Sequence, residues 1–580
     1  MLLAHKIFLA MMRLSTRLAR FALPALLAIF CGLTTEACGA LSVKATSPSN
    51  RSSRSSSSSA SPVPITDYIH ASWARLTRSM SDCNSLIDPK LHTTPVLYLP
   101  REVALPADVA ALQRECHVEV LRLPITITDF GQIHESQIQT PGLLYLPHPY
   151  VVPGGRFNEM YGWDSFFILK GLLDDHHERL AQGIVENFFY EIAHYGGVLN
   201  ANRTYYFTRS QPPFLSSMIR AVYDAKIADH QPQQALDWLR EAYPYAVRDH
   251  ALWASPIHAA GDTGLARYFD VGTGPVPEMA DASSYYPDII RWLLAHPKLH
   301  TGYLVYGGPH PDAAMRARLV MESCNPMHSV VCARAHVQGY WLTRAFYQGD
   351  RAMRESGFDT SFRFGPFSGS TEEFAPVGLN ALLYKYEHDL AWMASQLNKP
   401  AEAKHWNQLA AARRAAMNHY FWNQKRGMYF DYNFVTHRQS DYAFITTFYP
   451  LWTGAASPAQ ARDLIAALPL FERRGGLSTS LYNSGEQWDL PYGWAPTNWI
   501  AVEGLLAVHD RADARRIAEK WNQTVRNGYQ RDHAIYEKYD VVNGTNNFHA
   551  TAGYAQNVIG FGWTNAVYLE FASLLQQNTR

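Results

Sequence analysis

Three tryptophans, a carboxylate and a carboxamide lie within one short segment, residues 487–499, which reads QWDLPYGWAPTNW. Neither an amphipathic helix nor a strand requires this combination of side chains. Indole rings can stack against a flat ligand, and a carboxylate and a carboxamide can bond to its hydroxyl groups. The segment therefore predicts one wall of a site for a polar ligand, although buried packing is the simpler explanation for any single tryptophan.

A second segment, residues 153–167, reads PGGRFNEMYGWDSFF and combines an arginine, a tryptophan and a carboxylate. Its two adjacent glycines allow a sharp turn that can direct Arg156 into a cleft, and Trp163 and Asp164 stand just before a helical pattern. Such a group can hold a polyol by charge-assisted hydrogen bonds and ring stacking. Taken singly, Arg156 would more often be a structural ion pair and Trp163 a core residue.

A third segment, residues 200–214, reads NANRTYYFTRSQPPF and supplies further donors. Arg209, Ser210 and Gln211 directly precede two prolines, which end one element and suit the first turn of a following helix. A polar helix cap would explain Ser210 alone. Together with the other two segments, these donors favour one shared polar site.

Helical periodicity dominates the chain from about residue 162 onward. Apolar residues recur at three- and four-residue intervals in 214–225 and 499–508. Three helical runs begin with Gly-Trp, at residues 162, 493 and 562, so several helix entrances can present aromatic rings to one space. This predicts an all-α toroid whose loops converge on a central pocket, with a multi-helix bundle as the alternative. Short, proline-interrupted apolar runs predict an extended, strand-containing cap at about 65–152.

Charge and composition exclude several kinds of partner. Lys plus Arg equals Asp plus Glu at 51 each, so no net charge attracts nucleic acid or anionic lipid, and we expect a neutral small-molecule substrate and no nucleic-acid partner. Aromatic residues make up 13% of the chain, which suits a sugar-binding cleft. The 24 histidines show no HExxH pattern and no ligand spacing with cysteines, so we predict no metal and no cofactor.

The amino-terminal region has the pattern of an export signal. Three arginines precede an apolar run at 21–33 that is too short for a confident membrane span. We therefore expect a signal peptide over 1–40, a periplasmic or secreted protein, and no integral membrane span in the mature chain. Lipid attachment at Cys38 is the alternative. A Ser-rich, disordered linker is predicted for 41–64, followed by a single catalytic domain over 65–580.

Four cysteines remain outside the signal region, at positions 83, 116, 324 and 332. An exported protein could use them in disulfides, and four cysteines allow three pairings. We favour Cys83 with Cys116 and Cys324 with Cys332.

Segments 153–167 and 487–499 closely resemble the two signature segments of the trehalase family, glycoside hydrolase family 37. Other segments resemble the family in the same order, so that the resemblance spans roughly residues 140–575; they are 200–214, 355–364, 378–391, 421–433, 537–541 and 560–567. The resemblance implies a single-domain (α/α)6 toroid. It also implies metal-independent hydrolysis of α,α-trehalose to two glucose molecules, with inversion at one anomeric carbon.

The resemblance also implies the catalytic residues. Asp359, in ESGFDTSFRF, looks like the general acid, and Glu537, in YEKYD, looks like the general base. Inversion requires two carboxyl groups about 6.5–9.5 Å apart, so that a water molecule fits between one of them and the sugar. Partial desolvation would keep the acid protonated, and Lys538 and Asp540 could influence the electrostatics of the base.

Substrate contacts carry over in the same way. By resemblance these are Arg156, Trp163, Asp164, Asn200, Arg209, Ser210, Gln211, Glu278 and Gly357. In the wall at 487–499, Gln487 and Trp488 are candidate contacts, and Asp489 is a candidate for either contact or bracing.

Four positions depart from the family pattern. The family usually reads PRPE where this chain reads PVPE, which places Val276 where an arginine is expected. Gly553 stands where a glutamate is expected, Gly378 where an aspartate is expected, and Phe358 where a tryptophan is expected. A lost charge-assisted hydrogen bond costs roughly 1.5–3 kcal/mol, so recognition of the second glucose could be weakened or redirected.

An exported, monomeric trehalase is the leading hypothesis. The alternatives are an inverting α-glucosidase acting on another small α-linked disaccharide and a non-catalytic sugar-binding protein on the same fold. A phosphorylase is less attractive because the sequence has no clear phosphate-binding loop.

Overall fold

The computed structural model describes residues 63–87, 94–280, 284–299, 302–327, 329–550 and 556–577. Residues Val63–Arg580 form one compact unit, and every element named below belongs to it. The predicted signal peptide and most of the predicted linker lie outside the described residues. None of the described helices is long and apolar enough to cross a membrane.

Six helices of this unit form a closed inner ring in which each packs against the next and the last packs against the first. In order they are α5 (Gly162–Asp174), α7 (Leu215–Ala228), α13 (Val377–Gln396), α15 (Tyr449–Thr453), α17 (Ala495–Ala507) and α19 (Gly562–Gln576). In α5 and α17 nearly every residue is buried. A helix that is apolar on all sides has to lie between other layers, which explains the inner position of these two.

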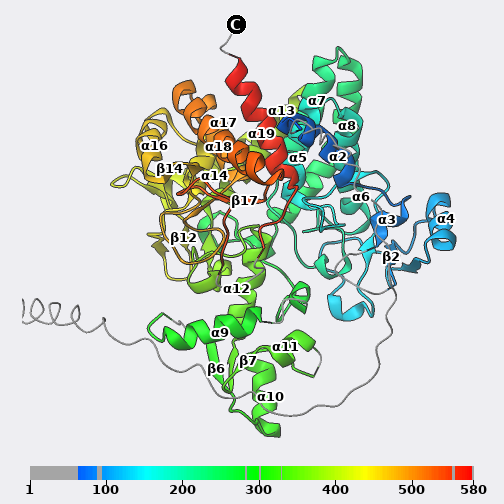
Figure 1. Cartoon of the computed structure of the whole chain (residues 1–580), viewed down its shortest axis with the longest axis vertical. Helices are drawn as coiled ribbons and strands as arrows, with labels where there is room; N and C mark the ends of the chain where they lie inside the picture. The colour runs from blue at the N-terminus through cyan, green and yellow to red at the C-terminus, as the bar shows by residue number, and fades with distance from the viewer. Residues whose placement is uncertain are drawn as a thin grey trace, which may run out of the picture. The chain divides into compact units, whose positions relative to one another are not determined.

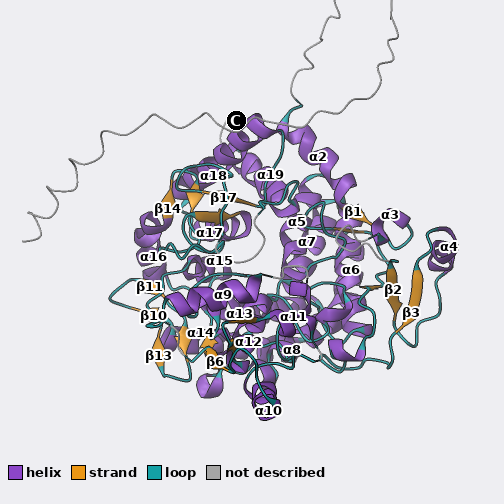
Figure 2. Cartoon of the chain, turned by 60° about the horizontal axis from the view of Figure 1, so that its bottom comes forward, coloured by secondary structure: helices purple, strands orange, loops and turns teal. Residues whose placement is uncertain are grey.

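A second set of helices packs on the outside of this ring. They are α2 (Ile65–Leu76), α6 (Glu178–His194), α8 (Pro232–Trp253), α14 (Pro400–Tyr420), α16 (Pro458–Phe471) and α18 (Arg511–Asp532). Unlike the inner helices, α6 and α18 bury one face and expose the other. The predicted all-α toroid is therefore confirmed, and the short strands visible in Figure 2 form no barrel.

The amino-terminal part of the unit contains strands, as predicted, and also helices that the sequence did not reveal. Its elements are α2, β1 (Thr77–Arg78), α3 (Cys83–Leu86), β2 (Val96–Leu99), α4 (Ala107–Glu115), β3 (Glu119–Arg122), β4 (Leu143–Leu144) and β5 (Tyr150–Val151). Strand β2 is the centre of a parallel sheet with β3 and β4 rather than an edge strand. All four of its residues are buried, as expected for a central strand.

A small subdomain separates α8 from α12 (Arg344–Glu355), and it lies at the bottom of Figure 1. It comprises α9 (Tyr285–Ala295), β6 (Leu304–Tyr306), α10 (Ala313–Glu322), α11 (Val330–Arg334), β7 (His336–Val337) and β8 (Tyr340–Leu342). Its strands form a sheet in the order β6-β8-β7, and it has an apolar cluster of its own. Both favoured disulfides are present, Cys324–Cys332 in this subdomain and Cys83–Cys116 in the amino-terminal part.

The remaining strands are short and connect helices of the ring. They are β9 (Phe374–Ala375), β10 (Trp422–Asn423), β11 (Met428–Tyr429), β12 (Tyr432–Asn433), β13 (Arg438–Gln439), β14 (Glu472–Arg473), β15 (Gly476–Leu477), β16 (Tyr492–Trp494) and β17 (Lys538–Asp540). The antiparallel pair β16–β17 is the one that matters most for the site. It places the wall at 487–499 beside the segment that carries Glu537.

Candidate active site

The segments predicted to carry the chemistry meet at the amino-terminal ends of the inner helices. Trp163 and Asp164 lie in the first turn of α5, and residues 209–211 precede α7. Residues 487–489 precede α17, and the carbonyl of Glu537 accepts a hydrogen bond from Trp563 in the first turn of α19. Helix amino termini carry a partial positive charge, which suits a site rich in carboxylates.

The loop that carries Asp359 leaves α12 through a turn at Gly357. Gly357 has φ +74°, and a Cβ atom there would lie 2.9 Å from the Trp163 indole. Only glycine combines this conformation with such a close approach without strain. On the other side of the loop, the Gln487 amide donates to the Asp359 carbonyl, and the Trp488 N–H donates to the Thr360 carbonyl at 3.0 Å. The loop is thus held between α5 and the wall at 487–499.

Asp359 lies beside a cation and is partly removed from water. Its side chain is 39% exposed, and Arg354 Nη1 lies 3.9 Å from Asp359 Oδ2. Desolvation raises the pKa of Asp359 to about 6, against the lowering effect of the Arg354 and Arg209 charges and with a further increase from Glu537. A carboxyl group with this pKa holds a proton in weakly acidic solution.

Glu537 is buried immediately before β17. Its N–H donates to the Val558 carbonyl at 2.9 Å, and Lys538 Nζ lies 2.5 Å from Glu537 Oε2. Both side chains of this ion pair are almost completely removed from solvent. The backbone and the carboxylate of Glu537 are therefore both fixed by the surrounding protein.

Asp164 brings a third carboxyl group to the same space. Burial raises the pKa of Asp164 well above its ordinary value, and the charges of Glu537 and Asp359 raise it further. Each of these carboxyl groups lies close enough to influence the others electrostatically. The structure thus brings together Asp164, Asp359 and Glu537, which are far apart in the sequence.

A cluster of aromatic rings lies behind these carboxyl groups. The Trp163 ring centroid is 5.8 Å from that of Trp488, 5.6 Å from that of Trp563 and 5.5 Å from that of Phe358. Trp488 and Trp494 stack on each other at 3.8 Å with an interplanar angle of 6°. Part of the predicted stacking wall therefore uses its rings within the protein core.

Arg209 and Glu278 form an ion pair near Asp359. Arg209 Nη2 donates to Glu278 Oε1, and Nη1 lies 3.6 Å from Asp270 Oδ2. Three buried polar atoms around the site, Arg209 Nε, Glu278 Oε2 and Gln487 Oε1, have no hydrogen-bond partner among the described residues. Buried polar atoms are rarely left unpaired, so these atoms point to a polar ligand that would pair with them.

Asn200, Ser210 and Gln211 are already bonded within the protein. Gln211 Oε1 accepts from the Trp163 N–H at 2.9 Å, and Asn200 Nδ2 donates to the Ser210 carbonyl at 3.3 Å. The Ser210 hydroxyl donates to the Val198 carbonyl at 2.6 Å. These bonds hold the segment before α7 in place. Ser210 does not cap a helix, because the N-cap of α7 is Phe214 and no side chain bonds there.

Two other predicted residues have different surroundings. Arg156 is exposed and lies with its guanidinium 5.5 Å from the centroid of the Phe157 ring. Asp489 is buried and accepts from the Phe362 N–H and the Tyr442 hydroxyl, each at 2.8 Å. Asp489 therefore braces the loop that follows Asp359.

Arg354 is the residue near the acid that the sequence analysis missed. Val276, which replaces an expected arginine, is fully buried, and its N–H donates to the Tyr286 hydroxyl at 3.0 Å. Arg354 instead brings a cation to Asp359 from the end of α12. Its guanidinium stacks 5.1 Å from the Tyr285 ring, and its Nε lies 3.4 Å from Asp350 Oδ2. The signal in the sequence was an arginine five residues before Asp359.

Among the other departures, Gly378 has a structural explanation. Gly378 lies in the first turn of α13, where a Cβ atom would meet Thr446 Cγ2 at 3.0 Å. An aspartate from elsewhere, Asp431, accepts from the Val377 N–H at 2.8 Å and forms two 2.7 Å bonds with Arg363. Gly553 lies outside the described residues.

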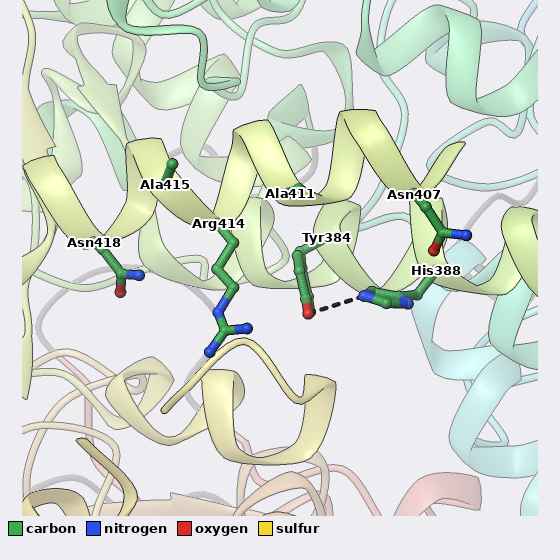
Figure 3. Close-up of a pocket in the computed structure, with 7 residues that line it drawn as sticks. All are labelled: Tyr384, His388, Asn407, Ala411, Arg414, Ala415 and Asn418. Atoms are coloured by element: carbon green, nitrogen blue, oxygen red, sulfur yellow. Dashed lines mark hydrogen bonds between the residues drawn. The ribbon is translucent and has the colours of Figure 1, made fainter. Parts of the chain in front are cut away.

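No group of three or more His, Cys, Asp or Glu side chains that could hold a metal ion occurs within the described ranges. A separate pocket of about 430 Å³ lies between α13 and α14 (Figure 3). It is lined by Tyr384, His388, Asn407, Ala411, Arg414, Ala415 and Asn418. None of these residues belongs to the predicted site.

Comparisons with known proteins agree with the sequence motifs. The trehalase family model matches residues 108–286 and 339–576. A cytosolic neutral trehalase of Neurospora crassa is 33% identical over 575 residues, covering 88% of this chain and 72% of the relative. A probable trehalase of Saccharomyces cerevisiae is 32% identical, covering 86% of this chain and 67% of the relative. The solved structure of neutral trehalase Nth1 from Saccharomyces cerevisiae is 30% identical with a TM-score of 0.71, covering 88% of this chain and 94% of that chain.

These relatives contradict the prediction of export. Those from Neurospora crassa, Pyricularia oryzae and Emericella nidulans are named cytosolic neutral trehalases. The expectation of a periplasmic or secreted protein, with lipid anchoring at Cys38 as its variant, is therefore wrong. Its basis was an apolar run behind arginines, and hydropathy and charge alone do not specify recognition for export.

Proposed function

The chain belongs to the trehalase family and is a glycoside hydrolase, and from this premise we propose that it hydrolyses α,α-trehalose to two glucose molecules with inversion at one anomeric carbon. The observation that carries the proposal is the convergence of Asp359 and Glu537, with Asp164, in one space beside Arg209 and Arg354. The relatives named above are trehalases, which supports the substrate.

In the proposed reaction, Asp359 is the general acid. Its carboxyl group donates a proton to the glycosidic oxygen as the bond from that oxygen to the anomeric carbon breaks. A pKa of about 6 suits this role, because the group is protonated in weakly acidic solution and still gives up its proton readily.

Glu537 is the general base on the opposite face of the sugar. It accepts a proton from a water molecule whose oxygen attacks the anomeric carbon. The new bond forms on the face opposite the leaving group, so one glucose is released as the β-anomer and the other as the α-anomer. The ion pair with Lys538 supports this role, because an opposite charge at 2.5 Å favours the ionised carboxylate.

The substrate contacts remain the set given above, to which we add Arg354. Its guanidinium supplies the positive charge that is absent at Val276, and it lies near Asp359, where the second glucose would leave. The unpaired atoms of Arg209, Glu278 and Gln487 could then bond to sugar hydroxyl groups. In this proposal Arg354 keeps a positive charge near the second glucose, which favours trehalose over a different disaccharide.

Domain organisation belongs to the same proposal. We place the whole activity in one catalytic domain over 65–580 that acts as a monomer. Every predicted site residue lies in the compact unit Val63–Arg580.

Proton NMR of the products tests the proposal. Trehalose, maltose, kojibiose and nigerose are compared as substrates, and spectra are recorded before the products mutarotate. We expect trehalose to be the best substrate and its first products to be equal amounts of α- and β-glucose. Two α-anomers would contradict inversion, and a faster rate on another disaccharide would favour the inverting α-glucosidase. Asp359→Asn and Glu537→Gln should each remove about 10²–10⁴-fold of the rate.

A further inference from the structure

Lys538 and Glu537 are neighbours in the chain, yet their side chains contact each other. Lys538 Nζ lies 2.5 Å from Glu537 Oε2. Successive side chains of a strand point to opposite faces, so regular strand geometry does not impose this contact. Side-chain exposure is 0% for Lys538 and 5% for Glu537. Burying such a pair is costly unless its geometry is good, so a buried pair beside a catalytic centre calls for an explanation.

The surroundings of Lys538 leave its ammonium group little freedom. The group lies 4.9 Å from the centroid of the Trp494 ring and 4.0 Å from that of Phe548. Trp494 is also the register partner of Lys538 across the β16–β17 pair. Asn557 fixes the backbone, because its Nδ2 donates to the Lys538 carbonyl at 2.8 Å and its Oδ1 accepts from the Lys538 N–H at 3.4 Å.

The charges around this pair explain why a cation is needed there. The carboxyl groups of Asp164 and Asp359 both lie close enough to repel the Glu537 carboxylate whenever they are ionised. Repulsion among three carboxyl groups favours protonation, and a protonated Glu537 could not accept a proton from water. The charge of Arg156 also reaches Lys538, and the charges of Arg354 and Arg209 act on Asp359. Burial lowers the pKa of Lys538, and the charges of Glu537 and Asp359 raise it.

We propose that Lys538 is a positioning residue that keeps the Glu537 carboxylate ionised and correctly oriented to take a proton from the attacking water. The inference rests on the proposed function, because it assumes that Glu537 is the base. Lys538 itself does not touch the sugar in this scheme. Its loss should therefore change the rate and the pH dependence much more than substrate binding.

Lys538→Met is the test variant. Methionine has a similar length and suits an aromatic cage, so we expect the variant to fold. With trehalose as substrate, kcat should fall about 10- to 100-fold. A general base typically raises the rate about 10²–10⁴-fold, and the variant should lose a large part of this increase. The acidic limb of the pH profile of kcat/KM should move up by about 1–3 pH units, because an opposite charge no longer favours the ionised carboxylate. KM should change by less than about threefold.

Two further variants make the test specific. Lys385→Met is a matched control, because Lys385 also pairs with a carboxylate, Asp389 at 2.8 Å, and lies 5.4 Å from the Trp452 ring. It should leave kcat and the acidic limb unchanged. Lys538→Arg keeps the positive charge, so its acidic limb should stay within about half a pH unit of the unmodified protein even if kcat falls. This variant also provides the test if Lys538→Met does not fold.

The possible outcomes separate this inference from the proposed function. If the unmodified protein releases no glucose from trehalose, the proposed function fails. If it releases glucose and Lys538→Met keeps both kcat and the acidic limb, Lys538 does not serve the base. A rise in KM with an unchanged limb would make Lys538 a binding residue instead. A limb displaced by a full pH unit in folded Lys538→Arg would also overturn the inference.

Discussion

Arg354 shows that a charge near a reacting group can be supplied from a different part of the chain. The position where the family pattern has an arginine is occupied by Val276, which is completely buried. Arg354 reaches the acid from the end of α12, and Asp350 and the ring of Tyr285 hold it there. We therefore propose that the site uses a cation near the acid and that Arg354 supplies it.

Replacing Arg354 tests this interpretation. Arg354→Gln should lower kcat/KM for trehalose about 10- to 150-fold, because a charge-assisted hydrogen bond contributes roughly 1.5–3 kcal/mol. Adding Val276→Arg should not restore the rate, since it places a charge in a fully buried position and should lower the Tm. Steady-state kinetics and thermal unfolding provide the two measurements. Recovery of activity in the double variant would show that position 276 still faces the sugar.

Asp359 gives an expectation for the pH profile. The acid acts in its protonated form, so kcat/KM should fall as the pH rises through about 6, the pKa of Asp359. Arg354 lowers this pKa, so Arg354→Gln should move the alkaline limb to higher pH. Arg220→Gln serves as the control, because Arg220 forms an exposed pair with Asp224 on α7. An alkaline limb that does not respond to Arg354→Gln would mean that another group is the acid.

At the scale of elements, the turn after α12 fixes the acid through its backbone. Gly357 lies against the Trp163 indole in a conformation with positive φ, and Gln487 and Trp488 bond to the carbonyls that follow. The first turn of α5 and the wall at 487–499 therefore act together on one loop. These two segments are more than 300 residues apart in the sequence, yet both contact the loop that carries Asp359.

Gly357→Ala tests the role of this turn. A Cβ atom would lie 2.9 Å from the Trp163 indole, and an alanine at φ +74° is strained as well. We expect kcat to fall about 10- to 100-fold, because a displacement of the acid by about 1 Å can cost this much. Gly454→Ala is a control with a similar φ of +77° and no atom near the added Cβ. Equal activity losses in the two variants would mean that backbone strain alone, and not the contact with Trp163, lowers the activity.

The wall at 487–499 has a more structural role than its composition suggested. Trp488 and Trp494 stack on each other, and Asp489 accepts hydrogen bonds from the loop after Asp359. Gln487 combines both functions, because its amide braces the acid loop while its Oε1 has no partner among the described residues. The segment therefore braces the loop that carries Asp359, and we propose that Gln487 Oε1 bonds to the sugar.

At the scale of the whole molecule, the ring of inner helices explains how distant residues meet. Site residues precede or begin α5, α7, α17 and α19, so closing the ring brings their amino-terminal ends to one space. The subdomain between α8 and α12 contributes Tyr285 beneath Arg354. Most of it lies between the two parts of the chain that the family model matches, 108–286 and 339–576.

A protein that begins at Val63 should retain the full activity. Every predicted site residue and the complete ring lie in the compact unit Val63–Arg580. We expect kcat/KM for trehalose to stay within about twofold of the value for the full chain. The truncation removes no residue that we propose to contact the transition state, so the rate should be little changed. The Tm should also be unchanged. Loss of activity in a folded, truncated protein would contradict the single-domain prediction.

The sequence by itself determined the family, the toroid and the candidate acid and base, because long motifs and helical periodicity are local properties of the chain. It also favoured the Cys83–Cys116 and Cys324–Cys332 pairs that the structure contains. Local composition could not decide the location of the protein, and the prediction of export was wrong.

Only the tertiary structure decided which side chains share the space around Asp359. The sequence could not assign a site role to Arg354, nor show that Val276 is buried, because both depend on how α12 packs against the subdomain that follows α8. The same holds for Asp431, which lies at the start of α13 although its own segment comes more than 50 residues later. Burial and charge at a site result from contacts between distant segments, so they appear only when the ring closes.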